Sequence, residues 1–477
     1  MSRIFSAGLI VGLFVFPAGA YYGGGQGTAD QPYLISTAAH LTAIGSTPSD
    51  WDKCFKLTAN IDMRNVSPTQ YKRIGTPEDR PFRGVFDGNY KTISNFRLHS
   101  EEGSYLGLFG IVDGASARIV NVTLLDPDVA GDNGRYVGAL VGLVSNGTFA
   151  NCHVRGGSIR GASFVGGLIA RKAGGTAVTD CTTVGTVRGG ARVGGLIGAN
   201  LGADVTRCHA AGEVWGDASS WSVAGLIGEN ESAEVTACHA DSKVQGNDRV
   251  GGLIGDNIRG TASRCWADGT VQGNTNVGGL IGQNTGGKTY DCYAMAAVTG
   301  GTPVGGLVGY NAPTCSCTVY VSSLITRSYA AGRVRGTNAG GLVGLSFRSS
   351  TETSFWDIAT TGCTFSDGGM GKTSVQMYSL ATYVGAGWDF AGEKTNGTLD
   401  IWCLPVPKGY PQFTWERTGV DFNADNRVDL RDFALLAKCW RQADTASWSG
   451  GRYVAADGVV NFDDLGNLAD QWLAHRR

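Results

Sequence analysis

The sequence lacks any apolar run long enough to cross a membrane, and it lacks any concentration of positive charge. Its longest apolar run, from Ala7 to Phe16, falls short of the about 20 residues that a transmembrane helix needs. The 39 Lys and Arg residues are scattered and nearly balanced by 41 Asp and Glu, which leaves a formal net charge of -2. Without a basic stripe, nucleic acid is not an expected partner. Hydrophobic residues still make up 42% of the chain, so it can bury a core.

The first twenty residues have the features of a secretory signal peptide. One basic residue, Arg3, precedes the short apolar run, and the segment ends in the small residues Ala18, Gly19 and Ala20. We expect cleavage after Ala20 and an exported mature chain with no transmembrane segment.

Glycine is abundant, at 74 of 477 residues, or roughly double the usual share of about 7%. Many glycines belong to a short segment of the type VGGLIG, which returns every 27 to 35 residues. The leucines of its successive copies are Leu140, Leu168, Leu196, Leu226, Leu253, Leu280, Leu307 and Leu342. A period of this length predicts a solenoid, a propeller or another repeat array.

Each copy contains three short apolar patches separated by turn residues. In the copy that begins at Val250 the patches read VGGLIG, TASRCWA and TVQG. They are too short and too rich in glycine for helices, and they show no 3.6-residue period. Three short strands and three turns predict one coil of a parallel β-helix, in which stacked coils rise by about 4.8 Å each. Equivalent residues should then form columns along the solenoid.

Three kinds of column follow from this stacking. Gly252, Gly279 and Gly306 recur where a side chain would collide or where the chain must turn. The repeat leucines form an inward apolar column. An asparagine lies four residues after the leucine in five copies, where it can bond the nearby backbone and the asparagines above and below: Asn200, Asn230, Asn257, Asn284 and Asn311.

Half of the twelve cysteines form a fourth column, 12 or 13 residues after the repeat leucine: Cys152, Cys181, Cys208, Cys238, Cys265 and Cys292. Their neighbours are mostly polar and variable, so we expect the thiols to face the core as small hydrophobes. Disulfides between stacked equivalents are unfavourable, because parallel Cβ atoms about 4.8 Å apart miss the usual separation of about 3.8 Å. A zinc site of adjacent Cys and His residues is not expected either, since neighbours on a strand point to opposite faces. The sequence leaves open the disulfide state of Cys54, Cys315, Cys317, Cys363, Cys403 and Cys439.

The repeat resembles the GLUG motif of bacterial secreted and surface proteins. The matching text is VGGLIGxNxxGxVxxCxAxGxVxG, seen best over residues 193–300, and the resemblance covers residues 105–345. It implies a β-solenoid in an exported, often adhesin-like or protease-associated protein, and it implies no catalytic residue.

The segments on either side of the repeats are expected to cap the solenoid. Residues 21–104 should form an N-terminal cap and the first coils, with a short helix that starts at the N-cap Thr37 and stops at Gly45. Residues 346–416 are rich in aromatic and turn residues and should form the C-terminal cap.

The last segment, residues 417–477, carries the clearest metal-binding pattern. Oxygen-bearing side chains occupy positions 1, 3, 5, 9 and 12 of a calcium loop, with the backbone carbonyl of Arg427 at position 7: Asp421, Asn423, Asp425, Asp429 and Asp432. A second copy retains Asp457, Asn461 and Asp464. Tyr453 and Ala455 stand at its positions 1 and 3, so this second site should be weak or empty.

An amphipathic helix is expected after each loop, and the whole segment resembles a type I dockerin. That family docks a cohesin through Ser and Thr pairs at loop positions 10 and 11. Those positions here hold Leu430 with Arg431 and Phe462 with Asp463, so a calcium-stabilised helical hairpin without a partner is the alternative.

We therefore expect an all-β parallel β-helix with a small all-α calcium-binding module. The favoured function is a non-catalytic scaffold, secreted or held at a bacterial cell surface, that binds an extracellular polysaccharide, a cohesin-like protein or a surface component. The alternative is a polysaccharide lyase or glycoside hydrolase. Its candidate residues are Glu229 and Asp256, which should lie roughly 5 Å apart on neighbouring coils, a spacing that suits a retaining glycosidase; they could equally be solvated charges.

Overall fold

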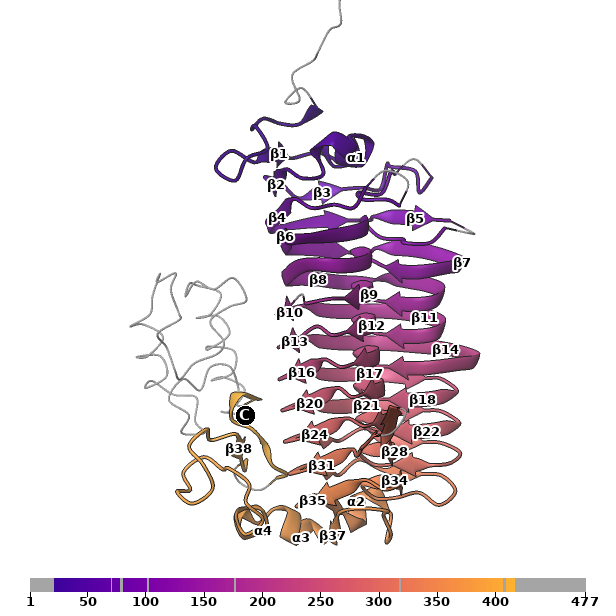
Figure 1. Cartoon of the computed structure of the whole chain (residues 1–477), viewed down its shortest axis with the longest axis vertical. Helices are drawn as coiled ribbons and strands as arrows, with labels where there is room; N and C mark the ends of the chain where they lie inside the picture. Colours follow the sequence, from indigo (N-terminus) through magenta and orange to yellow (C-terminus); the bar gives the residue numbers. More distant parts are fainter. Residues whose placement is uncertain are drawn as a thin grey trace, which may run out of the picture.

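The computed structural model describes residues 21–69, 71–77, 80–100, 103–175, 177–316, 319–405 and 409–416. In these residues the chain winds into a parallel β-solenoid of about ten turns, drawn with its long axis vertical in Figure 1. Ile227, Ile254 and Ile281 lie in register on three successive turns. The predicted parallel β-helix is confirmed here, whereas the expected signal peptide and the dockerin-like module lie outside the described residues.

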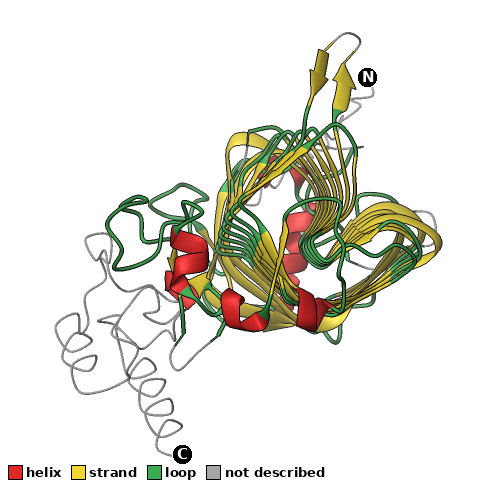
Figure 2. Ribbon diagram, turned by 90° about the horizontal axis from the view of Figure 1, so that it is seen from below, coloured by secondary structure: helices red, strands yellow, loops and turns green. Residues whose placement is uncertain are grey.

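Each repeat contributes to three walls of parallel strands. The first wall follows the repeat leucine and contains β9 Ile169–Ala173, β12 Ile197–Leu201, β15 Ile227–Glu231, β19 Ile254–Ile258, β23 Ile281–Thr285, β28 Val308–Ala312 and β34 Val343–Ser346. The second contains β10 Val178–Thr179, β13 Val205–Thr206, β16 Glu234–Thr236, β20 Thr261–Ser263, β24 Lys288–Tyr290, β31 Leu324–Thr326 and β35 Ser350–Glu352. The third contains β11 Thr182–Gly194, β14 His209–Ala224, β17 His239–Gln245, β18 Asp248–Gly251, β21 Trp266–Gln272, β22 Thr275–Gly278, β25 Tyr293–Ala294, β26 Ala297–Thr299, β27 Val304–Gly305, β32 Tyr329–Ala330, β33 Val334–Arg335, β36 Phe355–Asp357 and β37 Met370–Lys372. Viewed along the axis, the strands of successive turns superpose (Figure 2).

The first turns combine short strands with longer ones. They comprise β1 Tyr33–Ile35, β2 Cys54–Leu57, β3 Ile61–Asp62, β4 Val85–Ser94, β5 Arg97–His99, β6 Phe109–Leu125, β7 Asp128–Gly138 and β8 Val141–Gly166. Helix α1 Ala38–Ser46, followed by η2 Pro48–Asp50, lies at this end, and Thr37 caps α1 by accepting a 3.2 Å hydrogen bond from the His40 amide. The prediction that Gly45 stops this helix is wrong. Gly45 lies inside the helix, where a Cβ would stand 1.9 Å from the Lys72 carbonyl oxygen.

Three columns of left-handed residues turn the chain between walls. The first precedes the cysteines, with φ between 51° and 54° at Asn151, Asp180, Arg207, Ala237, Arg264 and Asp291. The second precedes the glycine pair, with φ between 50° and 63° at Tyr136, Phe164, Arg192, Ser222, Arg249 and Asn276. The third follows the asparagines, at Gly174, Gly202, Ser232, Arg259 and Gly286. Most of these residues are not glycine, so each corner costs about 1 kcal/mol that the paired strands must offset.

The repeat glycines are required by close packing between turns. A Cβ on Gly252 would lie 2.0 Å from the Gly279 carbonyl oxygen, and one on Gly279 would lie 2.1 Å from that of Gly306. Neither glycine has a positive φ. Collision between stacked turns, rather than chain reversal, therefore explains why these glycines recur.

The predicted inward columns are confirmed. All eight repeat leucines and all six stacked cysteines are fully buried. The six cysteines are free thiols, as are Cys54, Cys363 and Cys403. Burial raises the pKa of the Cys181 and Cys238 thiols. Below Cys292 the column continues in Ser328 and Ser354, so a small side chain is what this position requires.

The asparagine column forms a continuous hydrogen-bonded ladder. Each side-chain amide donates to the next asparagine at 2.8–2.9 Å, from Asn200 through to Asn311. The amide nitrogens of the first four also donate to the carbonyl three residues on in their own turn, at 2.8–3.2 Å. The buried Lys172 takes the ladder position one turn before Asn200, and burial lowers its pKa to about 7.

The C-terminal part both closes the coil and folds back along its side. The short helices α2 Ile358–Thr361, α3 Ser374–Met377 and α4 Leu380–Val384 lie at the lower end in Figure 1. A small antiparallel pair, β38 Trp402–Cys403 with β39 Gln412–Phe413, then precedes η3 Thr414–Glu416. The insertion before Leu342 forms a second antiparallel hairpin from β29 Thr314–Ser316 and β30 Val319–Val321, which stands off the coil in Figure 2.

Candidate functional site

The acidic pair singled out from the sequence is brought together by the strand register. Glu229 on β15 lies directly opposite Asp256 on β19. Their exposed fractions are only 6% and 1%. The alternative that these two residues are solvated surface charges is therefore wrong.

Each of these carboxylates is paired with an arginine from the second corner. Arg192 donates to Glu229 at 2.8 Å. Arg249 donates to Asp256 at 3.0 Å and to Asp248 at 2.9 Å. The corner and the first wall are thus joined by charge-assisted hydrogen bonds, which are stronger than neutral ones.

The surroundings of Asp256 disfavour the charged form of its carboxyl group. Burial raises the pKa of its carboxyl to about 6, the Arg249 guanidinium opposes that shift, and the charge of Glu229 adds to it. One of its oxygens, Oδ1, has no hydrogen-bond partner among the described residues. A raised pKa is a property of some catalytic acids, but a catalytic acid must also reach the bond that it cleaves. Carboxyl groups this buried, each beside an arginine partner, are held within the fold and do not reach a substrate.

The same corner carries a ladder of stacked rings and guanidinium groups. Tyr105, Tyr136 and Phe164 stack with centroids 5.0 and 4.8 Å apart. The Arg192 guanidinium then lies 4.7 Å from the Phe164 ring centroid and 4.0 Å from that of Trp221. These contacts are cation–π interactions, which contribute about 0.5–2 kcal/mol each.

Two more arginines flank the upper part of this ladder. The guanidinium carbon of Arg135 lies 5.5 Å from the Tyr136 centroid and 5.6 Å from that of Phe164. That of Arg171 lies 6.0 and 5.9 Å from the same two centroids. With Arg192, three cations surround Phe164, and only Arg192 is paired with a carboxylate of the described residues.

A second aromatic column lies outside the buried cysteines. His209, His239, Trp266, Tyr293 and Tyr329 stack in order, with centroid separations of 4.1, 4.5, 5.8 and 5.1 Å. Burial lowers the pKa of His239 to about 3, and the neighbouring His209 contributes to that shift. Each of these residues directly follows a buried cysteine or Ser328, and that placement is the signal by which the sequence could have revealed the column.

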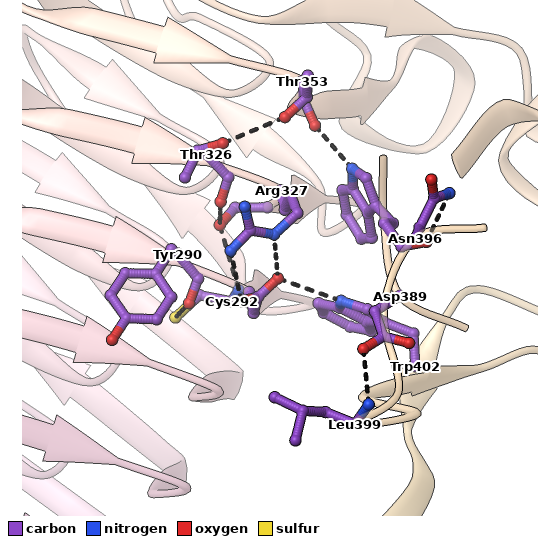
Figure 3. Close-up of polar contacts among 12 residues, drawn as sticks. Tyr290, Cys292, Thr326, Arg327, Thr353, Asp389, Asn396, Leu399 and Trp402 are labelled. Atoms are coloured by element: carbon purple, nitrogen blue, oxygen red, sulfur yellow. Dashed lines mark hydrogen bonds and ion pairs between the residues drawn. The ribbon is translucent and has the colours of Figure 1, made fainter. Parts of the chain in front are cut away.

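The C-terminal segment covers the lower end of this aromatic column. Trp402 and Phe413 lie against Tyr293, and Trp388 lies against Tyr329. Figure 3 shows the polar contacts that hold the segment in place. Asp291 accepts two hydrogen bonds from Arg327, at 2.7 and 2.9 Å, and one from the Trp402 indole at 3.5 Å. Residues 388–405 and 409–413 are thereby fixed to the side of the last turns.

The predicted calcium ligands cannot be placed. Both loops, from Asp421 to Asp432 and from Asp457 to Asp464, lie outside the described residues. Within the described part of the chain, no group of three or more His, Cys, Asp or Glu residues could hold a metal ion. No helix in that part is both long and apolar enough to span a membrane.

Comparison with known proteins supports the repeat assignment. The family model of the GLUG motif matches residues 189–214 and 273–299. "Halomucin" of Haloquadratum walsbyi is 34% identical over 140 residues, which are 28% of this chain and 2% of that protein. A "Putative Gly-rich membrane protein" of Evansella cellulosilytica is 33% identical over 129 residues, which are 25% of this chain and 14% of that protein. The chain therefore spans a small fraction of the length of both curated relatives.

One solved structure is also similar. It is a Bacteroides ovatus protein titled a "putative immunoglobulin A1 protease", with 19% identity and a TM-score of 0.38 over 83% of this chain and 97% of that one. The GLUG resemblance is thus confirmed for two of the repeats, and the dockerin resemblance stays a prediction.

Proposed function

We propose that this GLUG-repeat solenoid is an exported, non-catalytic scaffold whose long side walls bind an extracellular polysaccharide or a cell-surface component. One observation carries the proposal: the candidate catalytic acids, Glu229 and Asp256, are withdrawn from solvent and each is ion-paired with an arginine. The Arg192–Glu229 pair links neighbouring turns and the Arg249–Asp256 pair links the corner to the first wall within one turn, so neither carboxylate is open to a substrate. The outer surface of the walls is therefore the part of the solenoid that we propose binds a ligand.

The proposed location is outside the cell or on its surface. The signal-peptide pattern of residues 1–20 supports export. The names of the two curated relatives, a halomucin and a Gly-rich membrane protein, agree with this location.

The C-terminal segment is proposed to tether the scaffold through calcium. The first loop, with Asp421, Asn423, Asp425, Asp429 and Asp432, offers the ligand spacing of a calcium site. A cohesin-like protein or another surface component would be its partner. The test is a pull-down of the full chain with cohesin domains, with and without a chelator. Retention that the chelator does not reduce would contradict a calcium-dependent tether.

The scaffold role is tested by combining a binding array with a turnover assay. The mature chain is applied to arrays of glycans and surface proteins, and in parallel is incubated with polysaccharides while reducing ends and unsaturated products are measured. We expect binding without turnover. Turnover that Glu229→Gln abolishes, while the variant keeps its thermal midpoint, would replace the scaffold with a polysaccharide-degrading enzyme.

A further inference from the structure

The lower turns of the solenoid show how this corner neutralises an arginine. Arg192 meets Glu229 and Arg249 meets Asp256, in both cases with the acid on the first wall and the arginine at the second corner. The two acids follow one another in the same column. At this surface, arginine nitrogens therefore bind carboxylate oxygens at distances of 2.8–3.0 Å.

The upper turns contain arginines at the same surface and lack the acids, and one of these arginines, Arg171, itself stands in the column that holds Glu229 and Asp256 lower down. In the column of the first wall, Arg171 has Leu143 on one side and Ala199 on the other. Arg135 has Ser163 as its neighbour in the next turn. Neither guanidinium forms a hydrogen bond or an ion pair with a described residue. Arg135 is exposed and Arg171 is partly exposed.

The two guanidinium groups also share one apolar backing. Both lie within 6.0 Å of the ring centroids of Tyr136 and Phe164. These rings stack on each other, and both arginines lie against the stacked pair. Rings that lie close to a guanidinium exclude water from it, which strengthens the binding of an anion.

We propose that Arg135 and Arg171, backed by Tyr136 and Phe164, form a binding site for the carboxylate or sulfate groups of an acidic extracellular polysaccharide. The ligand supplies from outside the wall the anionic charge that Glu229 and Asp256 supply for the arginines below, because Arg171 itself fills the column of these acids in the upper turn. This inference rests on the proposed binding role of the side walls.

A polysaccharide fits this surface better than an acidic peptide does. Strands β7, β8 and β9, which carry the site, are each paired on both sides, so no free strand edge is available for a peptide to extend. The chain as a whole carries a net charge of -2, so a general attraction for polyanions is not expected.

The experiment measures retardation of the full mature chain in native gels that contain polygalacturonate, heparin, poly-glutamate or neutral pullulan. Polygalacturonate presents carboxylates and heparin adds sulfates, so the two arms separate the possible sources of the anion. We expect retardation by at least one of these two acidic polysaccharides, weaker retardation as salt is raised, and none by pullulan. The double variant Arg135→Gln with Arg171→Gln should weaken this binding at least tenfold, or about 1.4 kcal/mol.

A matched control changes the net charge by the same amount elsewhere. Arg333 and Arg335 are exposed on the third wall and form no ion pair with a described residue, and their Gln variants should bind within twofold of the wild type. Arg135→Lys with Arg171→Lys retains the charge but loses the planar fork, so its affinity should lie between wild type and the Gln variant. Thermal midpoints verify that all variants fold.

Four results would overturn the site. The Gln variant could bind as the wild type does, the control could lose as much affinity, or poly-glutamate alone could bind, which would point to an acidic protein. A wild-type chain that binds no acidic polymer also refutes the site. In that case a neutral glycan or surface protein captured on the array would leave the scaffold role standing, so the two failures are distinguishable.

Discussion

The asparagine ladder makes a sharp prediction for Asn257→Ala. Asn257 lies in the middle of the ladder and is fully buried. Its side chain accepts from Asn230 at 2.9 Å and donates to Asn284 at 2.8 Å and to the Gly260 carbonyl at 3.1 Å. Alanine removes all three hydrogen bonds and leaves the Asn284 and Gly260 acceptors without these donors.

The expected loss follows from the number of bonds and from the burial of their partners. Three net hydrogen bonds of about 1 kcal/mol each, with buried acceptors left unsatisfied, give a decrease in unfolding free energy of about 3–5 kcal/mol. Asn311→Ala is the internal control. Asn311 accepts one ladder bond at 2.9 Å and, among the described residues, donates only a long 3.4 Å bond to Ser346, so its loss should be about half as large.

Urea unfolding followed by far-UV circular dichroism measures both variants. The slope with denaturant should stay constant while the midpoint falls, since the native surface is unchanged. A loss below about 1 kcal/mol for Asn257→Ala, or one no larger than that for Asn311→Ala, would refute the idea that the ladder stabilises the turns cooperatively.

Three further predictions concern the glycines, the buried acid and the thiols. Gly252→Ala should lower the free energy of unfolding in urea by more than about 2 kcal/mol, because the new Cβ would lie 2.0 Å from the Gly279 carbonyl oxygen. Gly175→Ala is the control, since a Cβ there has no atom within 4 Å, and it should change stability by less than about 0.5 kcal/mol. Equal effects of the two variants would contradict the collision argument. Because the fold raises the pKa of Asp256 to about 6 from about 3.9 unfolded, its stabilising contribution is present below pH 4 and is lost as pH rises through 6. The free energy of unfolding of the wild type should therefore fall by up to about 3 kcal/mol relative to that of Asp256→Asn between pH 4 and 7. Parallel pH profiles of unfolding free energy for the two proteins would contradict this prediction. The six stacked cysteines should resist a thiol reagent in the native protein and react fully in guanidinium without a reductant, since they are buried and free; a need for reductant would disprove this.

Much of the architecture was predictable because the repeat sets its own register. Once Leu253 and Leu280 are aligned, every other residue of the two turns is aligned with them. The inward cysteines, the asparagine ladder and the recurring glycines follow from that alignment together with the spacing of stacked strands. Each turn pairs with the next turn along the chain, so the register of the strands follows directly from the repeat.

The corners and the candidate site were less predictable. Asp180 and Arg207 adopt left-handed backbone conformations that residue type alone does not indicate, because stacked strands force the turn on whatever residue stands there. Glu229 and Asp256 were recognised as neighbours, but their burial was missed, since the arginines that pair with them come from the corner, in one case from the neighbouring turn.

The sequence by itself determined the repeat, the parallel coil and the columns within it, because identical spacing forces identical side chains to stack. Only the tertiary structure decided which charges are neutralised and which face solvent. It also decided that residues 388–405 and 409–413 lie along the side of the coil and bury Tyr293 and Tyr329. Both outcomes depend on contacts between different walls or distant segments, and a one-dimensional period carries no information about such contacts.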